Sequence, residues 1–150
     1  MIRKFPAVAV VVTLTAWSLA AAQAPVAQEK HHAVNEKAAK TVNDCMIECE
    51  KCAAHCAHMV MNGQKEHFRT MQLCNECGAV CGLTHKFIYC QSPVLNHQAD
   101  ACAKICDACA DACEKAGAND AMMKKCAQMC RECATACRTM GKAEARPTAN

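Results

Sequence analysis

Cysteine residues recur along this sequence at intervals of three and four positions. Three segments each contain four cysteines in the order CxxxCxxCxxxC, and a fourth segment contains three. The members are Cys45, Cys49, Cys52 and Cys56; Cys74, Cys77 and Cys81; Cys102, Cys106, Cys109 and Cys113; and Cys126, Cys130, Cys133 and Cys137. The thiolate is a soft ligand, so a set of this size predicts chemistry with soft metal ions.

The spacing also predicts where the thiols lie. Residues three and four apart share one face of an α-helix, and a face with this period normally packs against other helices. In most bundles Leu, Ile and Val occupy that face. Here fifteen thiols occupy four such faces, with Thr70 where the second segment lacks a cysteine and Cys90 outside the pattern. We therefore expect a bundle whose core is lined with cysteine.

Three explanations of such a core compete. Cysteine can serve as a small apolar side chain, but fifteen of them bury far less area than the same number of leucines. The even count of 16 cysteines also suits a disulfide-stapled structural or interaction protein, although two or three bridges suffice for a small scaffold. Metal binding uses every cysteine of the repeat. We favour metal binding and keep the disulfide-stapled protein as the alternative.

The ligand pattern favours copper(I) over other thiophilic metals. Structural zinc and iron–sulfur sites draw their cysteines from loops and irregular backbone rather than from continuous helical faces. Copper(I) is soft and accepts two or three thiolates, so two cysteines one helical turn apart can chelate one ion. If each ion takes two sulfurs and each sulfur bridges two ions, the capacity is on the order of fifteen ions per chain.

Helix-breaking residues divide the chain into the elements that must position these cysteines. The sequence predicts helices over 35–61, ended by Asn62-Gly63, and over 65–89. A third helix starts with Ser92 as N-cap and Pro93 at its first position and ends at Gly117, and Asn119 caps a fourth that ends at Gly141. Short loops between them predict an all-α, antiparallel up-down-up-down four-helix bundle with a cysteine-lined core.

The two ends of this bundle differ in chemistry. At one end the inward positions and their neighbours include thioether and imidazole ligands, at Met59, His67, Met122 and Met123. At the other end the inward positions are mostly apolar: Ala38, Val42, Ile88, Leu95, Ala99 and Met140, with Phe87 nearby. We hypothesise that copper(I) enters and leaves at the Met/His end, although methionine also serves as an ordinary gap filler.

The N-terminal residues resemble an export signal. Arg3 and Lys4 precede an apolar run, and small residues at 20–22 fit a signal-peptidase site, so we predict a signal peptide over 1–22. The alternative is an uncleaved anchor, for which the run is short. The mature chain then has a flexible lead-in at 23–34, the copper-binding bundle at 35–141 and a tail at 142–150. It is periplasmic or extracellular, with no membrane segment after cleavage.

Charge and composition exclude several other functions. The net charge of +3 falls to +1 when Arg3 and Lys4 are removed, and no basic patch interleaved with aromatic residues indicates nucleic-acid binding. The sequence contains no Ser/His/Asp grouping or phosphate-binding loop, and thiols buried as metal ligands are poor nucleophiles toward outside substrates. We expect a binding protein rather than an enzyme.

The repeat, the four capped helices and the export signal together resemble the exported branch of the bacterial copper storage proteins. The resemblance covers about 35–141. It implies that the fifteen inward cysteines are copper(I) ligands, that Cys90 is an end-site ligand at most, and that the chain is a homo-oligomer, specifically a tetramer. Copper donor or acceptor proteins would be its other partners. Exported relatives are similar to twin-arginine substrates, whereas Arg3-Lys4 suits the Sec route.

Overall fold

The protein folds into four long helices, as the sequence predicts. The structure, a computed structural model, describes the backbone of residues 26–144 and the side chains of residues 35–142. The helices are α1 (Val26–Met61), α2 (Phe68–Tyr89), α3 (Leu95–Ala116) and α4 (Ala121–Glu144), with a 3₁₀ turn η1 (Lys65–His67) before α2. The predicted signal peptide lies outside the described residues. Within 26–144, no helix is both long enough and apolar enough to cross a membrane.

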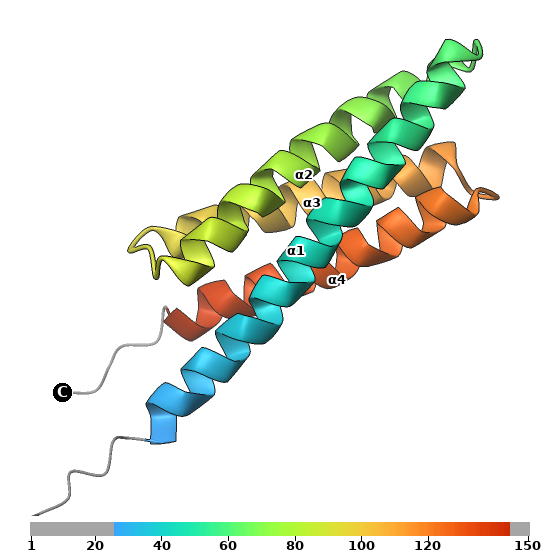
Figure 1. Cartoon of the computed structure of the whole chain (residues 1–150). Helices are drawn as coiled ribbons and strands as arrows, with labels where there is room; N and C mark the ends of the chain where they lie inside the picture. Colours follow the sequence, from blue (N-terminus) through green and yellow to red (C-terminus); the bar gives the residue numbers. More distant parts are fainter. Residues whose placement is uncertain (1–25, 145–150) are drawn as a thin grey trace, which may run out of the picture.

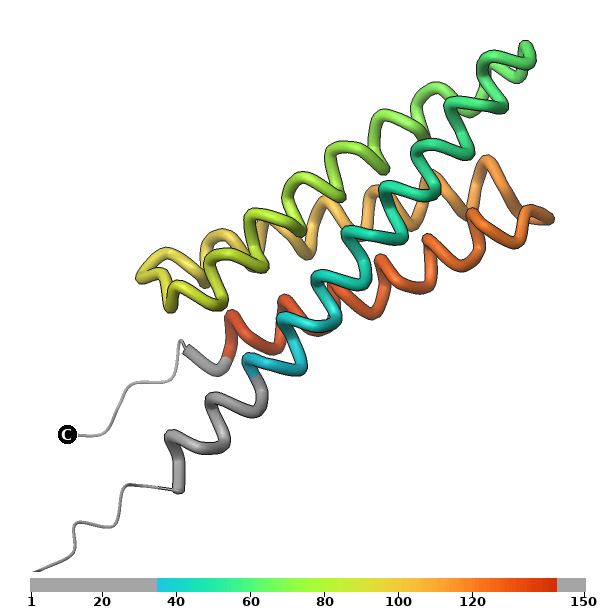
Figure 2. Tube along the Cα trace, viewed as in Figure 1, coloured from blue at the N-terminus to red at the C-terminus, as the bar shows by residue number. Residues whose placement is uncertain are grey.

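Consecutive helices run in opposite directions and form one bundle (Figure 1). Helix α1 packs against α2 and α4, and α3 packs against the same two helices. The tube view shows the three connections at alternating ends of the bundle (Figure 2). The antiparallel up-down-up-down four-helix bundle is therefore confirmed.

Several helix boundaries differ from the prediction. Helix α1 begins at Val26, so the backbone is already helical over most of the predicted lead-in at 23–34. The prediction that Ser92 caps α3 with Pro93 at its first position was wrong, because the helix begins at Leu95. Ser92 instead closes a turn, in which its carbonyl accepts a hydrogen bond from the Leu95 amide at 3.0 Å.

Helix α4 also departs from the prediction at both ends. Asp120, not Asn119, caps it, since Asp120 Oδ1 accepts hydrogen bonds from the amides of Met122 and Met123, both at 2.9 Å. Gly141 does not end the helix, which continues to Glu144. By contrast, Gly63 does end α1 as predicted, in a left-handed conformation (φ 91°) that favours glycine.

The core consists mainly of cysteine, with alanine beside it. Buried alanines on the three helices that carry the full cysteine pattern let the backbones approach closely; they are Ala39, Ala53, Ala103, Ala110, Ala127 and Ala134. The predicted apolar end is confirmed, since Ala38, Val42, Ile88, Leu95, Ala99 and Met140 are all buried. Larger apolar side chains are thus confined mostly to one end, and sulfur fills the rest.

Charged side chains hold the outside of the bundle together. Glu48 on α1 is 6% exposed, and its Oε2 lies 2.8 Å from Lys125 Nζ on α4. Arg131 on α4 pairs with Asp111 and Glu114 on α3, at 2.5 and 2.9 Å. These pairs join α4 to its two neighbours on the outside of the bundle, where each contributes about 1 kcal/mol or less.

Candidate metal centre

The fifteen cysteines of the repeat all face the interior. Each has no exposed surface, and all 16 cysteines carry free thiols. Cys90 differs, because it is exposed in the turn that follows α2. The structure thus places the predicted ligands on one internal surface and separates Cys90 from it.

The buried thiols gather into five groups whose sulfur atoms lie within 4.8 Å of one another. We name them by height along the bundle, from the apolar end toward the Met/His end. Group I is Cys102, Cys133 and Cys137; group II is Cys45, Cys81, Cys106 and Cys133; group III is Cys45, Cys49, Cys77 and Cys130; group IV is Cys49, Cys109, Cys126 and Cys130; group V is Cys52, Cys74, Cys113 and Cys126.

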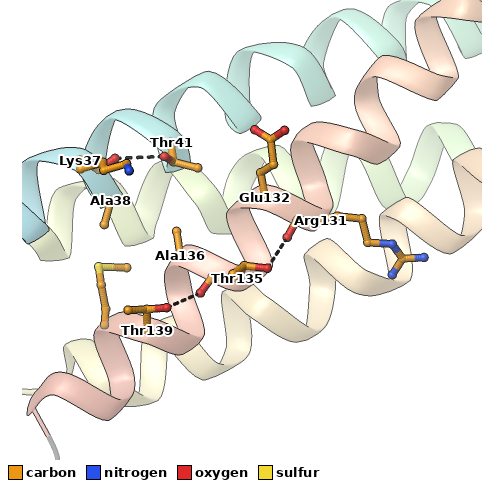
Figure 3. A pocket seen from close by; sticks show the side chains of 9 residues that line it. Lys37, Ala38, Thr41, Arg131, Glu132, Thr135, Ala136 and Thr139 are labelled. Atoms are coloured by element: carbon orange, nitrogen blue, oxygen red, sulfur yellow. Dashed lines mark hydrogen bonds between the residues drawn. The ribbon is translucent and has the colours of Figure 1, made fainter.

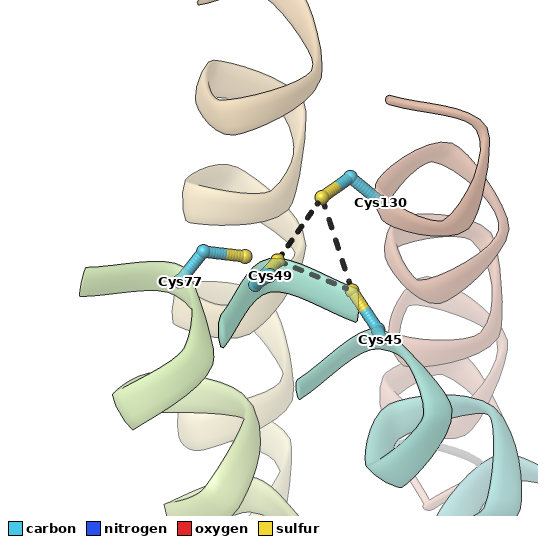
Figure 4. A group of neighbouring side chains, drawn as sticks. All are labelled: Cys45, Cys49, Cys77 and Cys130. Carbon is cyan, nitrogen blue, oxygen red and sulfur yellow. Dashed lines mark hydrogen bonds between the residues drawn. The ribbon is translucent and has the colours of Figure 1, made fainter. Parts of the chain in front are cut away.

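Group III shows how the helices converge. In Figure 4, Cys45 and Cys49 of α1 face Cys77 of α2 and Cys130 of α4. The Cys130 sulfur lies 3.5 Å from that of Cys49 and 3.8 Å from that of Cys45. Disulfide sulfurs are about 2.05 Å apart, whereas two thiolates on one metal with bonds of about 2.3 Å are separated by about 3.8 Å in a tetrahedron and 4.6 Å in a line. The spacing suits metal binding.

Shared cysteines join the groups into one continuous series. Cys133 belongs to groups I and II, Cys45 to II and III, Cys49 and Cys130 to III and IV, and Cys126 to IV and V. A metal ion in any group therefore has a thiol in common with an ion in the next group. Bridging thiolates are what a polynuclear soft-metal cluster requires.

The thiols influence one another's ionisation because they are packed together away from water. Nine of the fifteen have a raised pKa. For Cys106 the cause is hydrogen bonding with Cys102 and further thiols, together with burial. Hydrogen bonding from Cys109 instead lowers the pKa of Cys113 to about 5. The thiols of the metal-free core share protons in these hydrogen bonds, and a bound cation replaces the protons.

The predicted Met/His end is only partly assembled by the fold. Met123 is fully buried, and Met59 and His67 line a cavity of about 450 Å³ together with Asp120 and the 115–119 loop. His67 is 5% exposed, and its Nδ1 has no hydrogen-bond partner among the described residues. Met122 is 38% exposed and does not line that cavity. Met59, His67 and Met123 thus form the inner part of this end, which we call the Met/His mouth.

Cys56 lies between the thiol groups and the mouth. It is fully buried, yet it belongs to none of the five groups found among the described residues. It precedes Met59 by one helical turn. In the sequence, Cys56 has the same spacing as the other cysteines of its helix. Its absence from the thiol groups could therefore not be predicted from the sequence.

Two further features were not predicted from the sequence, one beside the mouth and one near the apolar end. His55 Nε2 lies 2.9 Å from Asp120 Oδ2, which ties α1 to the residue that caps α4. A groove of about 620 Å³ runs between α1 and α4 near the apolar end (Figure 3). Its lining of threonine, alanine and charged side chains contains no cysteine or histidine, and Met140 is the one sulfur-containing residue in it, so the groove offers a soft metal ion a single thioether.

Comparison with known proteins agrees with this geometry. A family model described as copper storage protein matches residues 28–142. The chain belongs to the copper storage protein family. The match covers all four helices and every cysteine of the repeat, so copper storage is the function that family and core share.

Two solved copper storage structures resemble the bundle. The Cu(I)-bound copper storage protein BsCsp3 is 30% identical and superposes with a TM-score of 0.66, over 72% of this chain and 98% of that one. The apo form of copper storage protein 3 from Bacillus subtilis is 31% identical with a TM-score of 0.59, over 71% and 97% of the two chains. The cysteine-rich protein YhjQ of Bacillus subtilis (strain 168), itself uncharacterized, is 30% identical over 74 residues, or 48% of this chain and 68% of that protein.

Proposed function

We propose that this protein stores copper(I) by binding many ions to the fifteen inward thiolates. The observation that carries the proposal is the continuous series of thiol groups, in which every group from II to V shares a sulfur with its neighbour. Copper(I) needs two or three soft ligands and tolerates bridging, so the series can fill without a gap. Storage rather than catalysis fits thiols that no substrate outside the bundle can reach.

The charge of the filled core supports a high capacity. Each bound thiolate carries one negative charge and each copper(I) ion one positive charge, so equal numbers leave the buried core neutral. A partly filled core with excess thiolate would bury uncompensated charge, which is costly. We expect a capacity on the order of fifteen ions per chain.

An anaerobic titration tests this proposal. Copper(I) would be added to the reduced mature protein in the presence of a chromophoric copper(I) chelator, while free thiols are counted in parallel. We expect the chelator to remain copper-free until the capacity is approached, with thiol reactivity falling in proportion. A capacity of one or two ions, or a freshly isolated protein with almost no free thiols and no copper, would overturn the proposal in favour of the disulfide-stapled alternative.

The Met/His mouth is proposed as the route of entry and release. The support is the buried His67 Nδ1, which has no hydrogen-bond partner in the described part of the chain and lies beside Met59 in a cavity that opens at this end. Replacing Met59 and Met123 by leucine should slow loading and leave the capacity intact. The matched control is Met140→Leu at the apolar end, where Met140 is also buried. Equal loading rates in both variants would refute the route.

The proposal also includes export of the protein and its assembly into a homo-oligomer. The apolar run and small residues of 1–22 support a signal peptide and a periplasmic or extracellular location. A homo-oligomer, specifically a tetramer, rests on the family resemblance. Mass spectrometry of the secreted protein and light scattering of the purified protein measure these two features directly, and a full-length cytoplasmic product or a monomer would contradict them.

A further inference from the structure

We propose that the same core takes a divalent thiophilic cation of the zinc group at two independent tetrathiolate positions when copper is absent. The inference begins with groups II and V. In each group the four thiols come from four different helices, one from each of α1, α2, α3 and α4. Four ligands converging from four directions suit a tetrahedral ion, whereas copper(I) uses two or three.

The distances in these groups match a tetrahedral site. Metal–sulfur bonds of about 2.3 Å place the ligand sulfurs of a tetrahedron about 3.8 Å apart. In group II the Cys81 sulfur lies 3.8 Å from Cys106 and 3.9 Å from Cys133. In group V the Cys113 sulfur lies 3.8 Å from Cys74 and 3.9 Å from Cys52. The helices therefore hold the ligands near the required spacing before any ion binds.

The shared cysteines fix the number of such ions. A tetrathiolate ion without bridging needs four thiols of its own, so two groups that share a cysteine cannot both be filled in this way. Groups II and V share no residue, and the same is true of groups II and IV and of groups III and V. No three of the four tetrathiolate groups are mutually independent. The core thus holds at most two mononuclear tetrathiolate ions per chain.

Charge determines which metal prevails. A divalent ion that displaces four thiol protons leaves a site with two net negative charges buried among cysteine and alanine side chains. Four copper(I) ions replacing it release the divalent ion and leave the same four thiolates neutral. Because buried net charge is costly, copper(I) should displace the divalent ion, and not the reverse. The divalent ions would keep eight thiols ligated, and so protected from oxidation, until copper arrives.

Cobalt(II) is the probe for this inference, since tetrahedral cobalt(II) has intense ligand-field bands whose position and intensity report the number of thiolate ligands, whereas six-coordinate cobalt(II) absorbs weakly. Titration of the reduced, metal-free full bundle should give tetrathiolate bands that reach a plateau at two equivalents per chain. Group I has three thiols, so an ion there would give the shifted bands of a trithiolate site and is counted separately. Addition of copper(I) should abolish them. A tetrathiolate plateau at one equivalent or fewer, or bands that persist with excess copper(I), would overturn the inference.

Two double variants test whether groups that share a cysteine exclude one another. Each variant removes two thiols, so the two differ only in which groups remain. Cys109→Ala with Cys113→Ala disables groups IV and V and leaves groups II and III, which share Cys45. That variant should bind one tetrathiolate cobalt ion. Cys77→Ala with Cys113→Ala disables groups III and V and leaves groups II and IV, which are independent. This control should bind two, and equal counts in the two variants would overturn the assignment.

The copper(I) titration separates this inference from the storage proposal. Both double variants keep thirteen of the fifteen inward thiols, so their copper(I) capacities should fall equally and slightly. Loss of copper(I) binding would contradict storage whatever cobalt does. Normal copper(I) binding with no tetrathiolate cobalt would contradict the divalent sites alone. Circular dichroism of both variants confirms that the bundle has folded.

Discussion

Gly117 supports the Met/His mouth at a contact that leaves no room for a side chain. The residue follows α3 and packs against Met123 near the start of α4. A Cβ atom on Gly117 would lie 2.1 Å from Met123 Sδ, 2.6 Å from its Cβ and 2.8 Å from its Cγ. Met123 is fully buried, and its Cβ cannot rotate away, so the start of α4 would have to move. We expect Gly117→Ala to destabilise the copper-free bundle by about 1–3 kcal/mol, the usual cost of overpacking.

Gly141→Ala is the matched control. Gly141 lies within α4, and nothing occupies the space within 4 Å of its would-be Cβ. Alanine stabilises a helix interior by roughly 0.5–1 kcal/mol relative to glycine. The two variants therefore change the same residue type in opposite directions, and their unfolding free energies should differ by about 1.5–4 kcal/mol.

Urea unfolding of the reduced, copper-free protein, followed by far-ultraviolet circular dichroism, measures both effects. The urea concentration at the unfolding midpoint should fall for Gly117→Ala and rise for Gly141→Ala. The slope of the unfolding free energy against urea concentration should stay the same. Copper(I) loading of Gly117→Ala should also slow, because Met123 and the cavity beside it are displaced. Wild-type stability in Gly117→Ala would refute this reading of the mouth, and a lower midpoint in Gly141→Ala would contradict the open helical environment of Gly141.

Three further predictions follow from the core and its surface. The nine raised thiol pKa values mean that the folded state holds protons that the unfolded chain releases above about pH 8.5. The unfolding free energy of the copper-free protein should therefore fall as pH rises above about 8.5, and constant stability up to pH 10 in urea unfolding would contradict this. Cys90→Ser should leave the copper(I) capacity unchanged, whereas Cys130→Ser, which removes a thiol shared by groups III and IV, should lower it; equal capacities in the titration would show the grouping to be wrong. Glu48→Gln should destabilise the bundle by about 1 kcal/mol, because it weakens the pair between the buried Glu48 carboxylate and the exposed Lys125 ammonium, while Glu50→Gln on the exposed face of α1 should have little effect in the same unfolding assay.

The repeat was sufficient to predict which thiols face inward, because a 3–4 spacing leaves little choice of helix face. It could not predict which thiols meet. The grouping of Cys45 with Cys81 and Cys106, for example, depends on the heights of three helices relative to one another, which the spacing within any one helix does not encode. For the same reason, only the structure shows that Cys56 belongs to none of the thiol groups.

Helix ends were predicted less well than helix faces. Asn119 and Asp120 are both good capping residues, and Asp120 caps α4 because its second oxygen also reaches His55 on α1. Gly141 was expected to end α4, yet glycine only weakens a helix and the segment after it remains helical. Met122 was included among the mouth residues from its neighbourhood in sequence, and the helix turns its side chain to the exposed surface.

The central claim is that the inward thiolates hold the copper, and a crystal of the copper(I)-loaded protein with anomalous scattering data at the copper edge tests it most directly. Our account predicts a row of copper peaks along the bundle axis, from the level of Cys137 to that of Cys126, each bonded to sulfur atoms of groups I to V. Copper peaks confined to Cys90 and the surface histidines, with the inward sulfurs unbound or joined as disulfides, would contradict it.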